Sequence, residues 1–414
     1  MNIAIIGGGI TGLSAAYALQ TTHPEIDYCL LESDARWGGK MVTATVQNGA
    51  AHPLIIDGGP DTFVTRKREV WELVHALGLA EEITPGSETR GIYVLHGGKP
   101  IKVPLNPVAF ISSPILSLRG KLRMAAEPFV PARRDDADES LGEFVSRRLG
   151  REALERFVGP ILGGIYNTDP NHQSILVTSP IMRQMEAEYG GLFRATFARL
   201  RQAQQAKTSP QERPPRFIGL KGGAGVLVKA LVARLTGDLH LNAGVEWIAA
   251  DAAGYRLSLT NGSIIHAEGL ILATPANVAA RLLAEVAPQA AADLAKIKHV
   301  NIGTISIAFD KAAIPPELLT MQGVMIPRRE RRRIDAVTFT SNKDPTAPRK
   351  TNFWCACSLA VATPTWRASR TRICCGLCWM NCAPCWAWRR NRWSIGPSAG
   401  ARATPRRRWV TWSW

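Results

Sequence analysis

The sequence lacks the features that would place a protein across a membrane. No apolar run reaches the roughly 18 residues that a membrane-spanning helix needs. The N-terminus carries no basic segment and no small-residue cleavage site, which argues against a secretory signal peptide. We therefore expect a cytoplasmic protein whose membrane association, through residues 105 to 130, is at most peripheral.

Acidic residues are missing from the last 64 residues, which hold ten arginines, seven of the eight cysteines and nine of the twelve tryptophans. The first 350 residues carry 40 basic and 34 acidic groups, so most of the net charge of +16 comes from the tail. A basic nucleic-acid-binding protein is therefore not indicated, because its charge would rest on one aberrant segment. The chain is long enough for two or three domains.

The cysteines of the tail include two C-x-x-C spacings, which are found at Cys375, Cys378, Cys382 and Cys385. Such spacings can bind zinc or an iron-sulfur cluster. No histidine or glycine knuckle accompanies them, so we expect no metal site.

The genetic code offers another explanation of the tail. Cysteine and tryptophan codons begin with T, and a reading frame shifted back by one base makes that T the middle base, which always encodes Phe, Leu, Ile, Met or Val. Cysteines and tryptophans lie at 374, 375, 378, 379, 382, 385 and 386, the spacing of one apolar helix face. We infer a frameshift near Thr351 and expect residues 351–414 to be an out-of-frame tail, disordered or arbitrary in structure.

The N-terminal stretch from Ile3 to Leu13 reads as a buried strand, a glycine turn and the start of a helix. In this pattern Gly7 permits the tight turn, Gly9 admits a pyrophosphate and Gly12 lets the helix pack on the strand. The phosphates would lie at the helix N-terminus, beside Ile10 and Thr11. A second predicted strand ends at Glu32, twenty residues after Gly12, where an acid binds a ribose hydroxyl. The sequence therefore predicts a dinucleotide site.

Two further glycine pairs follow within fifty residues. Arg36, Gly38, Gly39 and Lys40 form one motif, and the stretch from Ile55 to Phe63 contains the other. Glycine pairs suit a backbone wrapped around a phosphate or a flat ring. With the N-terminal stretch, they resemble the start of the FAD-containing amine-oxidase superfamily.

The middle of the chain narrows this resemblance. Residues 105 to 210 show mostly helical spacing, which predicts a helical subdomain inserted into an α/β body. Within it, the segments 147–156 and 160–170 resemble the oxygen-dependent protoporphyrinogen and coproporphyrinogen oxidases. The segments 59–63, with Arg66 and Lys67, and 120–124 resemble them too. The similarity covers residues 1 to about 350.

The resemblance implies a Rossmann-type FAD-binding domain, an inserted helical subdomain and a mixed-sheet substrate domain. We expect FAD-binding segments at 1–85 and 215–300, substrate-domain segments at 86–110 and 301–350, and the helical insertion at 111–210. The implied reaction is oxidation of protoporphyrinogen IX or coproporphyrinogen III to the porphyrin in haem biosynthesis, with oxygen as acceptor. Because the flavin carries the chemistry, no catalytic side chain is assigned.

The same resemblance assigns candidate site residues. Arg90 and Lys67 are candidates for binding a substrate propionate, since a guanidinium suits carboxylate geometry. The backbone of Val245 would meet the adenine, and the turn holding Thr274 would close near the cofactor. The full set of expected FAD contacts is Gly7, Gly9, Ile10, Thr11, Gly12, Glu32, Arg36, Gly38, Gly39, Lys40, Gly59, Pro60, Asp61, Thr62, Val245 and Thr274.

Two other interpretations stay open. The N-terminal motifs also fit a different flavin amine oxidase or a carotenoid desaturase, although the segment from Arg147 to Pro170 argues against it. The chain could also be an inactive frameshifted remnant, and retention of flavin on purification would distinguish that case.

Overall fold

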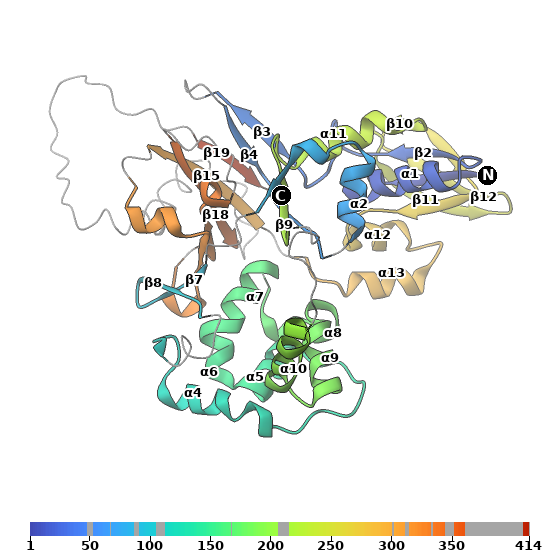
Figure 1. Ribbon diagram of the computed structural model, residues 1–414. Coiled ribbons are helices and arrows are strands. Elements are labelled where there is room, and N and C mark those ends of the chain that lie inside the picture. The colour runs from blue at the N-terminus through green and yellow to red at the C-terminus, as the bar shows by residue number, and fades with distance from the viewer. Residues whose placement is uncertain are drawn as a thin grey trace, which may run out of the picture.

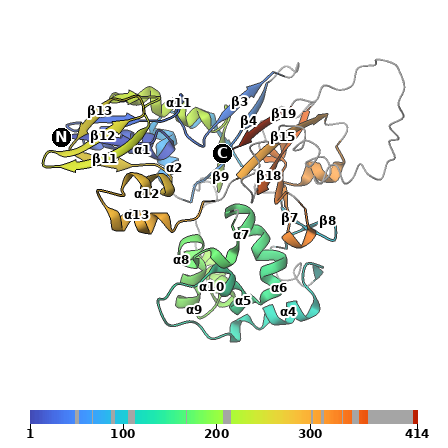
Figure 2. The same ribbon diagram turned by 180° about the vertical axis from the view of Figure 1, so that it is seen from behind.

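The computed structural model describes residues 1–47, 53–66, 68–86, 91–104, 112–166, 168–205, 215–299, 302–310, 314–332, 334–343, 352–360 and 409–413. In two opposite views the described chain forms two sheet-based regions side by side, with a bundle of helices beneath them (Figure 1, Figure 2). The mixed α/β architecture expected from the sequence is confirmed, and the domain boundaries remain predictions.

The first region is built on a parallel sheet with strand order β10-β2-β1-β14. Its strands are β1 (Asn2–Ile6), β2 (Asp27–Leu31), β10 (Asp238–His240) and β14 (Gly269–Leu272). Helices α1 (Ile10–Thr22) and α11 (Gly225–Arg234) pack together on one face, and the antiparallel strands β11 (Val245–Asp251), β12 (Gly254–Leu259) and β13 (Ile264–Ala267) contribute to the core on the other. The chain leaves this sheet after β2 and returns to it with β10, more than 200 residues later.

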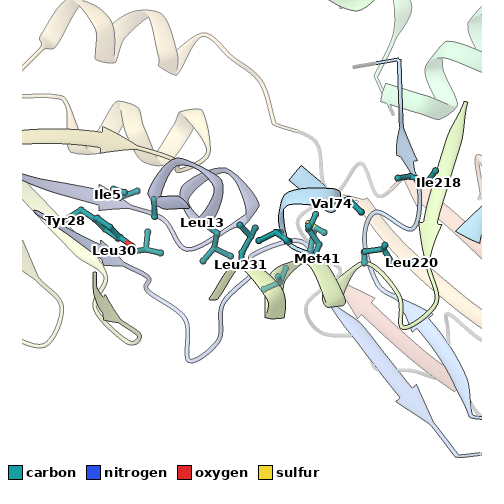
Figure 3. Close-up of a cluster of buried hydrophobic side chains, with 14 residues drawn as sticks. Ile5, Leu13, Tyr28, Leu30, Met41, Val74, Ile218, Leu220 and Leu231 are labelled. Atoms are coloured by element: carbon teal, nitrogen blue, oxygen red, sulfur yellow. The ribbon is translucent and has the colours of Figure 1, made fainter. Parts of the chain in front are cut away.

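The continuous apolar runs of β1 and β2 are explained by burial on both faces of this sheet. Ile5 and Leu30 point into a core that also contains Leu13 of α1 and Leu231 of α11 (Figure 3). The alternate residues of the same strands, among them Leu31, belong to a second core shared with β11 and β12.

The second region is a mixed seven-stranded sheet with the order β19-β15-β18-β17-β16-β7-β8. Its strands are β7 (Ile92–His96), β8 (Lys99–Lys102), β15 (Ile302–Asp310), β16 (Gly323–Met325), β17 (Ala336–Thr338), β18 (Asn352–Ala360) and β19 (Trp409–Ser413). One face carries an apolar core that includes Ile305, Val324 and Val337. The segment 301–350, which the sequence assigns to the substrate domain, thus contributes β15, β16 and β17 to this sheet.

The bundle consists of α4 (Leu118–Ala125), α5 (Leu141–Leu149), α6 (Arg151–Ala153), a π-helical turn at Leu154–Val158, α7 (Gly159–Tyr166), α8 (Ile175–Thr178), α9 (Pro180–Tyr189) and α10 (Leu192–Gln205). Its core contains Phe144, Val145 and Ile175. Helix α5 begins with a capping box between Ser140 and Glu143, which satisfies two amides of its first turn. The helical insertion predicted from spacing is thus present.

Smaller elements connect these regions. The hairpin of β3 (Thr43–Val46) and β4 (Leu54–Asp57) lies between the two larger sheets (Figure 1). A three-stranded sheet joins β5 (Phe63–Val64), β6 (Ile83–Pro85) and β9 (Phe217–Leu220). The remaining helices are α2 (Arg68–Ala76), α12 (Ala276–Leu282), α13 (Pro288–Ala295) and α14 (Thr340–Lys343).

Two segments of the tail are described, and both are strands. β18 pairs antiparallel with β15 over nine residues, and β19 pairs with the other edge of β15. The expectation of disorder is therefore wrong for these segments, because their aromatic and other apolar residues favour strands and their backbones supply partners that β15 and β17 need. Residues 361–408 and 414, with all the cysteines of the C-x-x-C spacings, lie outside the described residues. The frameshift itself stays a prediction.

Candidate functional site

The glycine turn after β1 leads directly into the first turn of α1. Gly9 caps the helix in extended backbone geometry and contributes no side-chain hydrogen bond. The first-turn amides of a helix have no partner within the helix, so those beginning at Ile10 and Thr11 are available to a bound phosphate.

The three glycines of the dinucleotide pattern, Gly7, Gly9 and Gly12, meet different surroundings. Gly7 has a φ of +109°, and a Cβ there would lie 2.8 Å from the carbonyl oxygen of Ala273. A Cβ on Gly12 would overlap the carbonyl oxygen of Gly7. A Cβ on Gly9, in contrast, would meet only the Cα of Gly39, at 4.0 Å. The chain itself therefore requires glycine at positions 7 and 12 but leaves room beside Gly9.

The motif from Arg36 to Lys40 closes over this turn. The amide of Gly38 donates to the carbonyl of Gly8 at 2.8 Å, and Gly38 bridges Gly9 in parallel. Gly38 and Gly39 have φ values of +101° and +53°, which disfavour other residues. The Arg36 guanidinium donates to the carbonyl of Gly39 at 2.7 Å, and Lys40 is exposed. Two glycine segments separated in the sequence thus lie directly against each other.

Glu32 lies at the end of β2 and is 8% exposed. One carboxylate oxygen accepts from the amide of Gly8 at 2.7 Å. The other accepts from the Ser33 hydroxyl at 3.0 Å and from the amide of Asp34 at 2.8 Å. A carboxylate offers about four acceptor positions, so Glu32 can hold the turn and still accept from a ribose hydroxyl.

Val245 lies near Glu32 because the backbone just before Val245 is hydrogen-bonded to the backbone at the end of β2. The amide of Ala243 donates to the carbonyl of Glu32 at 2.8 Å, and that of Asn242 donates to the carbonyl of Asp34 at 3.1 Å. Val245 then starts β11 and is 8% exposed, within the core of that side of the sheet. The structure thus brings Val245 close to the end of β2, where Glu32 lies.

Thr274 lies on the opposite side of Gly7. A Cβ on Gly7 would be 3.4 Å from the Cγ2 of Thr274. The Thr274 hydroxyl is buried and has no hydrogen-bond partner among the described residues. A buried hydroxyl without a partner is costly, and a bound ligand would remove that cost.

The segment of Gly59, Pro60, Asp61 and Thr62 follows β4. The Thr62 hydroxyl donates to Asp61 at 2.9 Å, and Pro60 is exposed. The residue before this segment, Gly58, is held by its amide, which donates to the carbonyl of Val42 at 2.7 Å.

Sequence reasoning missed the contacts that fix the start of α11 against β3 and β4. Asp57 accepts from the amide of Ala224 at 3.0 Å and from the Thr43 hydroxyl, and that hydroxyl in turn accepts from the amide of Gly225 at 2.8 Å. Asp57 and Thr43 therefore cap a helix that begins more than 160 residues later. Asp57 next to the glycine pair Gly58 and Gly59 was the feature of the sequence that could have indicated this contact.

A sequence profile described as flavin containing amine oxidoreductase matches residues 10–368. The chain belongs to this family. Coproporphyrinogen III oxidase of Bacillus subtilis is 30% identical over 367 residues, which are 84% of this chain and 74% of that protein. Protoporphyrinogen oxidase 1 of Arabidopsis thaliana is 30% identical over 337 residues, 76% of this chain and 60% of the relative.

Solved structures agree with this assignment of the flavin-containing amine oxidoreductase fold. A crystal structure of a candidate protoporphyrinogen oxidase from Exiguobacterium sp. 255-15 matches with a TM-score of 0.72 and 26% identity, covering 86% of this chain and 76% of that one. A reduced UDP-galactopyranose mutase matches with a TM-score of 0.65 and 17% identity over all of this chain and 82% of the other. The latter likeness concerns the fold alone.

The cofactor of this flavin-containing amine oxidoreductase is FAD, and the residues present fit it. The open side of Gly9 suits a pyrophosphate, and the spare acceptor positions of Glu32 suit a ribose. The Thr274 hydroxyl has no hydrogen-bond partner in the part of the chain that the structure describes. These three observations lie around one glycine turn.

Both candidates for a substrate propionate, Arg90 and Lys67, lie outside the described residues. Their assignment stays a prediction.

The segment 147–156, which resembles the porphyrinogen oxidases, begins with a structural ion-pair network. Arg148 and Glu127 are both fully buried and paired with each other. Arg147 pairs with Glu186 at 2.6 Å, and Arg183 pairs with the same carboxylate at 3.0 Å. The arginines of this segment thus hold α5 and α9 together within the bundle.

The network also sets protonation. Burial alone would raise the pKa of the Glu186 carboxyl, but the hydrogen bonds and charges of Arg147 and the charge of Arg148 lower that pKa overall. The same hydrogen bond to Glu186 raises the pKa of Arg147. Both groups therefore stay charged at neutral pH.

Proposed function

We propose that this chain is an FAD-dependent porphyrinogen oxidase of haem biosynthesis that converts coproporphyrinogen III or protoporphyrinogen IX to the porphyrin, with oxygen as acceptor. The observation that carries the proposal is the identity of 30% to named coproporphyrinogen III and protoporphyrinogen oxidases over most of the chain. The assembled dinucleotide turn supports the flavin part of it.

In this proposal the chain's residues bind and orient FAD and the substrate, and FAD would supply the hydride acceptor for the oxidation. Gly9, Ile10 and Thr11 would hold the pyrophosphate, and Gly12 would keep the helix close to the strand. Glu32 would hold the ribose and Val245 the adenine. The other proposed contacts are Gly7, Arg36, Gly38, Gly39, Lys40, Gly59, Pro60, Asp61, Thr62 and Thr274.

The test is direct oxidation by the purified chain. The proposal predicts that the porphyrin Soret band appears when reduced coproporphyrinogen III or protoporphyrinogen IX is added in air. If the protein carries FAD and oxidises neither substrate, then the proposed reaction is wrong and another flavin amine oxidase activity is indicated. The likeness to structures of putrescine oxidase, at 16% and 15% identity, concerns the fold only.

We also propose peripheral membrane contact through α4 and the turn that follows it. Leu118, Leu122 and Phe129 are 74%, 64% and 84% exposed. Leu118 and Leu122 are four residues apart and share one face of α4, next to the exposed Arg119. Apolar side chains beside a cation suit an anionic lipid surface.

No helix in the described ranges is long and apolar enough to cross a membrane. Sedimentation with phosphatidylglycerol vesicles tests the peripheral contact: the wild type should bind, and a variant with Leu118→Ser, Leu122→Ser and Phe129→Ser should not. Equal sedimentation of both proteins would refute the contact.

A further inference from the structure

The hairpin of β3 and β4 lies between the two sheet-based regions in both views (Figure 1, Figure 2). Thr43 and Asp57 pair across the open end of this hairpin, and the Thr43 hydroxyl donates to the Asp57 carboxylate. The same carboxylate oxygen accepts from the amide of Ala224 at 3.0 Å. The Thr43 hydroxyl in turn accepts from the amide of Gly225 at 2.8 Å. The open end of the hairpin therefore holds the start of α11.

The start of α11 fits closely against this end and leads to the proposed flavin site. Gly223 has a φ of +82°, and a Cβ there would lie 2.6 Å from Cγ2 of Thr43 and 2.8 Å from a carboxylate oxygen of Asp57. Further along α11, Val228 lies against Gly38, where an added Cβ would be 3.0 Å from both methyl groups of the valine. Because Gly38 is one of the proposed FAD contacts, α11 connects the hairpin to the flavin-binding region.

The residue after Asp57 is bonded to the other region. The carbonyl of Gly58 accepts from the hydroxyl of Thr304 at 3.3 Å, and Thr304 belongs to β15 of the seven-stranded sheet. The amide of Gly58 donates to the carbonyl of Val42 at 2.7 Å. Two consecutive residues, Asp57 and Gly58, thus link the flavin-binding region to the seven-stranded sheet. They immediately precede the segment 59–62, which we have proposed as a cofactor contact.

We propose that Thr43 and Asp57 are positioning residues that hold the segment 59–62 at the flavin and set its place relative to the seven-stranded sheet. The inference rests on the proposed function and deepens it. Hydride transfer needs reacting atoms about 3–3.5 Å apart, and a misplacement of about 1 Å caused by a distant substitution can slow a reaction about 100-fold. Neither side chain has to touch the substrate to have this effect.

The variant Thr43→Val tests the proposal in the FAD-saturated full chain, because valine keeps the shape of threonine and removes its hydroxyl. We expect the rate constant for anaerobic bleaching of the flavin absorbance, at saturating porphyrinogen, to fall about 10- to 100-fold. The Kd for FAD should change far less, since the glycine turn at Gly9 and the carboxylate of Glu32 stay in place. Thr43→Ser keeps the hydroxyl and should restore the rate constant.

Two measurements test the same variant without turnover. The visible absorption spectrum of bound FAD should shift in Thr43→Val, because the segment 59–62 changes its place at the flavin. Hydrogen exchange followed by mass spectrometry should become faster in the segments 58–64 and 223–227, because the amide of Gly225 loses its acceptor.

The variant Thr304→Val breaks the same link at its other end. It should speed hydrogen exchange in the segment 58–64 and slow flavin bleaching. The double variant Thr43→Val with Thr304→Val should be no slower than the slower single variant, because either change already disconnects the two regions. Additive effects on the activation free energy would show two independent contacts and would overturn the inference.

The matched control is Ser117→Ala in the helical bundle. The Ser117 hydroxyl also donates to a carboxylate, that of Glu152, at 2.7 Å, and accepts from an amide at the start of a helix, that of Gly120, at 3.1 Å. The control should lower the melting temperature, as Thr43→Val does, and leave the flavin spectrum and the bleaching rate constant unchanged.

A destabilised Thr43→Val protein with an unchanged rate constant would show that these contacts serve folding alone and would overturn the inference. An equal slowing in Ser117→Ala would overturn it too. If Thr43→Val does not fold, then Thr304→Val decides by the same measurements. If the wild type carries FAD but oxidises neither porphyrinogen, the proposed function fails. The spectrum of bound FAD then decides the positioning role by itself, since a shift in Thr43→Val supports it and an unchanged spectrum overturns it.

Discussion

The substitution Gly9→Ala separates the needs of the chain from those of its cofactor. The backbone of Gly9 has φ −71° and ψ 178°, which alanine adopts without strain. The added Cβ would meet only the Cα of Gly39, at 4.0 Å. Replacing glycine at a compatible position stabilises a protein by about 0.4–1 kcal/mol through the unfolded chain. At an N-cap, alanine is less favourable than glycine by a similar amount, so the stability of the FAD-free variant should stay within about 1 kcal/mol of that of the wild type.

The effect on FAD binding should be larger. If the pyrophosphate lies against Gly9, the new methyl group displaces it from the amides at the start of α1. The loss of one charge-assisted hydrogen bond costs about 1.5–3 kcal/mol, which corresponds to a roughly 10- to 150-fold higher Kd. Fluorescence titration of the FAD-free protein with FAD measures this Kd, and thermal unfolding measures the stability.

Two other glycines provide controls. Gly12→Ala should destabilise the FAD-free protein, because its Cβ overlaps the carbonyl of Gly7. Gly269→Ala should change neither property much, because its nearest contact is at 3.5 Å and it lies at the far end of the strand pair. Unaltered FAD affinity in Gly9→Ala would refute the placement of the pyrophosphate at this turn.

Three further predictions concern named carboxylates. Glu32→Gln should raise the Kd for FAD about 10- to 150-fold, measured by the same titration, because the neutral amide loses a charge-assisted hydrogen bond from the ribose worth about 1.5–3 kcal/mol. It should also lower the stability of the FAD-free protein by about 1–3 kcal/mol, because one amide oxygen cannot accept from both Gly8 and Asp34. Glu186→Gln should lower the free energy of unfolding, measured by urea unfolding, by about 3–5 kcal/mol at neutral pH without changing FAD affinity. The control is Arg151→Ala, which breaks the exposed Arg151–Glu155 pair and should cost at most about 0.5 kcal/mol in the same assay. The pKa of Glu186 is lowered in the folded state. The stability that its charge contributes is therefore complete above the pKa of the unfolded state and is lost as the pH falls through the folded value. The stabilities of wild type and Glu186→Gln should converge in acid, and a difference that stays constant below pH ~4 would contradict this.

The parts of the site that the sequence predicts are those fixed by local backbone geometry. Gly7 has a positive φ, and Gly12 touches the preceding turn. Because other residues would not fit at either position, the glycines themselves indicate the backbone conformation. β1 and β2 were predictable for a similar reason, because burial on both faces leaves an uninterrupted apolar run.

Contacts between distant segments were not predictable in this way. Asp57 caps a helix 167 residues away, and nothing in the sequence near Asp57 indicates which amide it accepts from. Glu127 and Glu186 likewise come from different segments and meet Arg148 only in the folded bundle. The sequence motif at Arg147 and Arg148 indicated a family, and the structure adds that these two side chains stabilise the bundle.

Segment β18 shows how context can determine a strand. Its residues begin the tail whose composition indicated a frameshift, yet its backbone pairs with both β15 and β17. The family match ends at residue 368, so it includes β18 and excludes the last 46 residues. Sequencing of the gene across codons 340 to 375 will show whether a base is missing or extra there.

The central claim is that the chain binds FAD and uses it to oxidise a porphyrinogen. The most direct measurement is to purify the full chain, quantify its flavin from the visible spectrum, and mix it with coproporphyrinogen III and with protoporphyrinogen IX under anaerobic conditions. The account predicts bound FAD whose absorbance near 450 nm bleaches on mixing with at least one of them and returns when air is admitted. A chain that carries no FAD, or carries FAD that neither porphyrinogen bleaches, would contradict it.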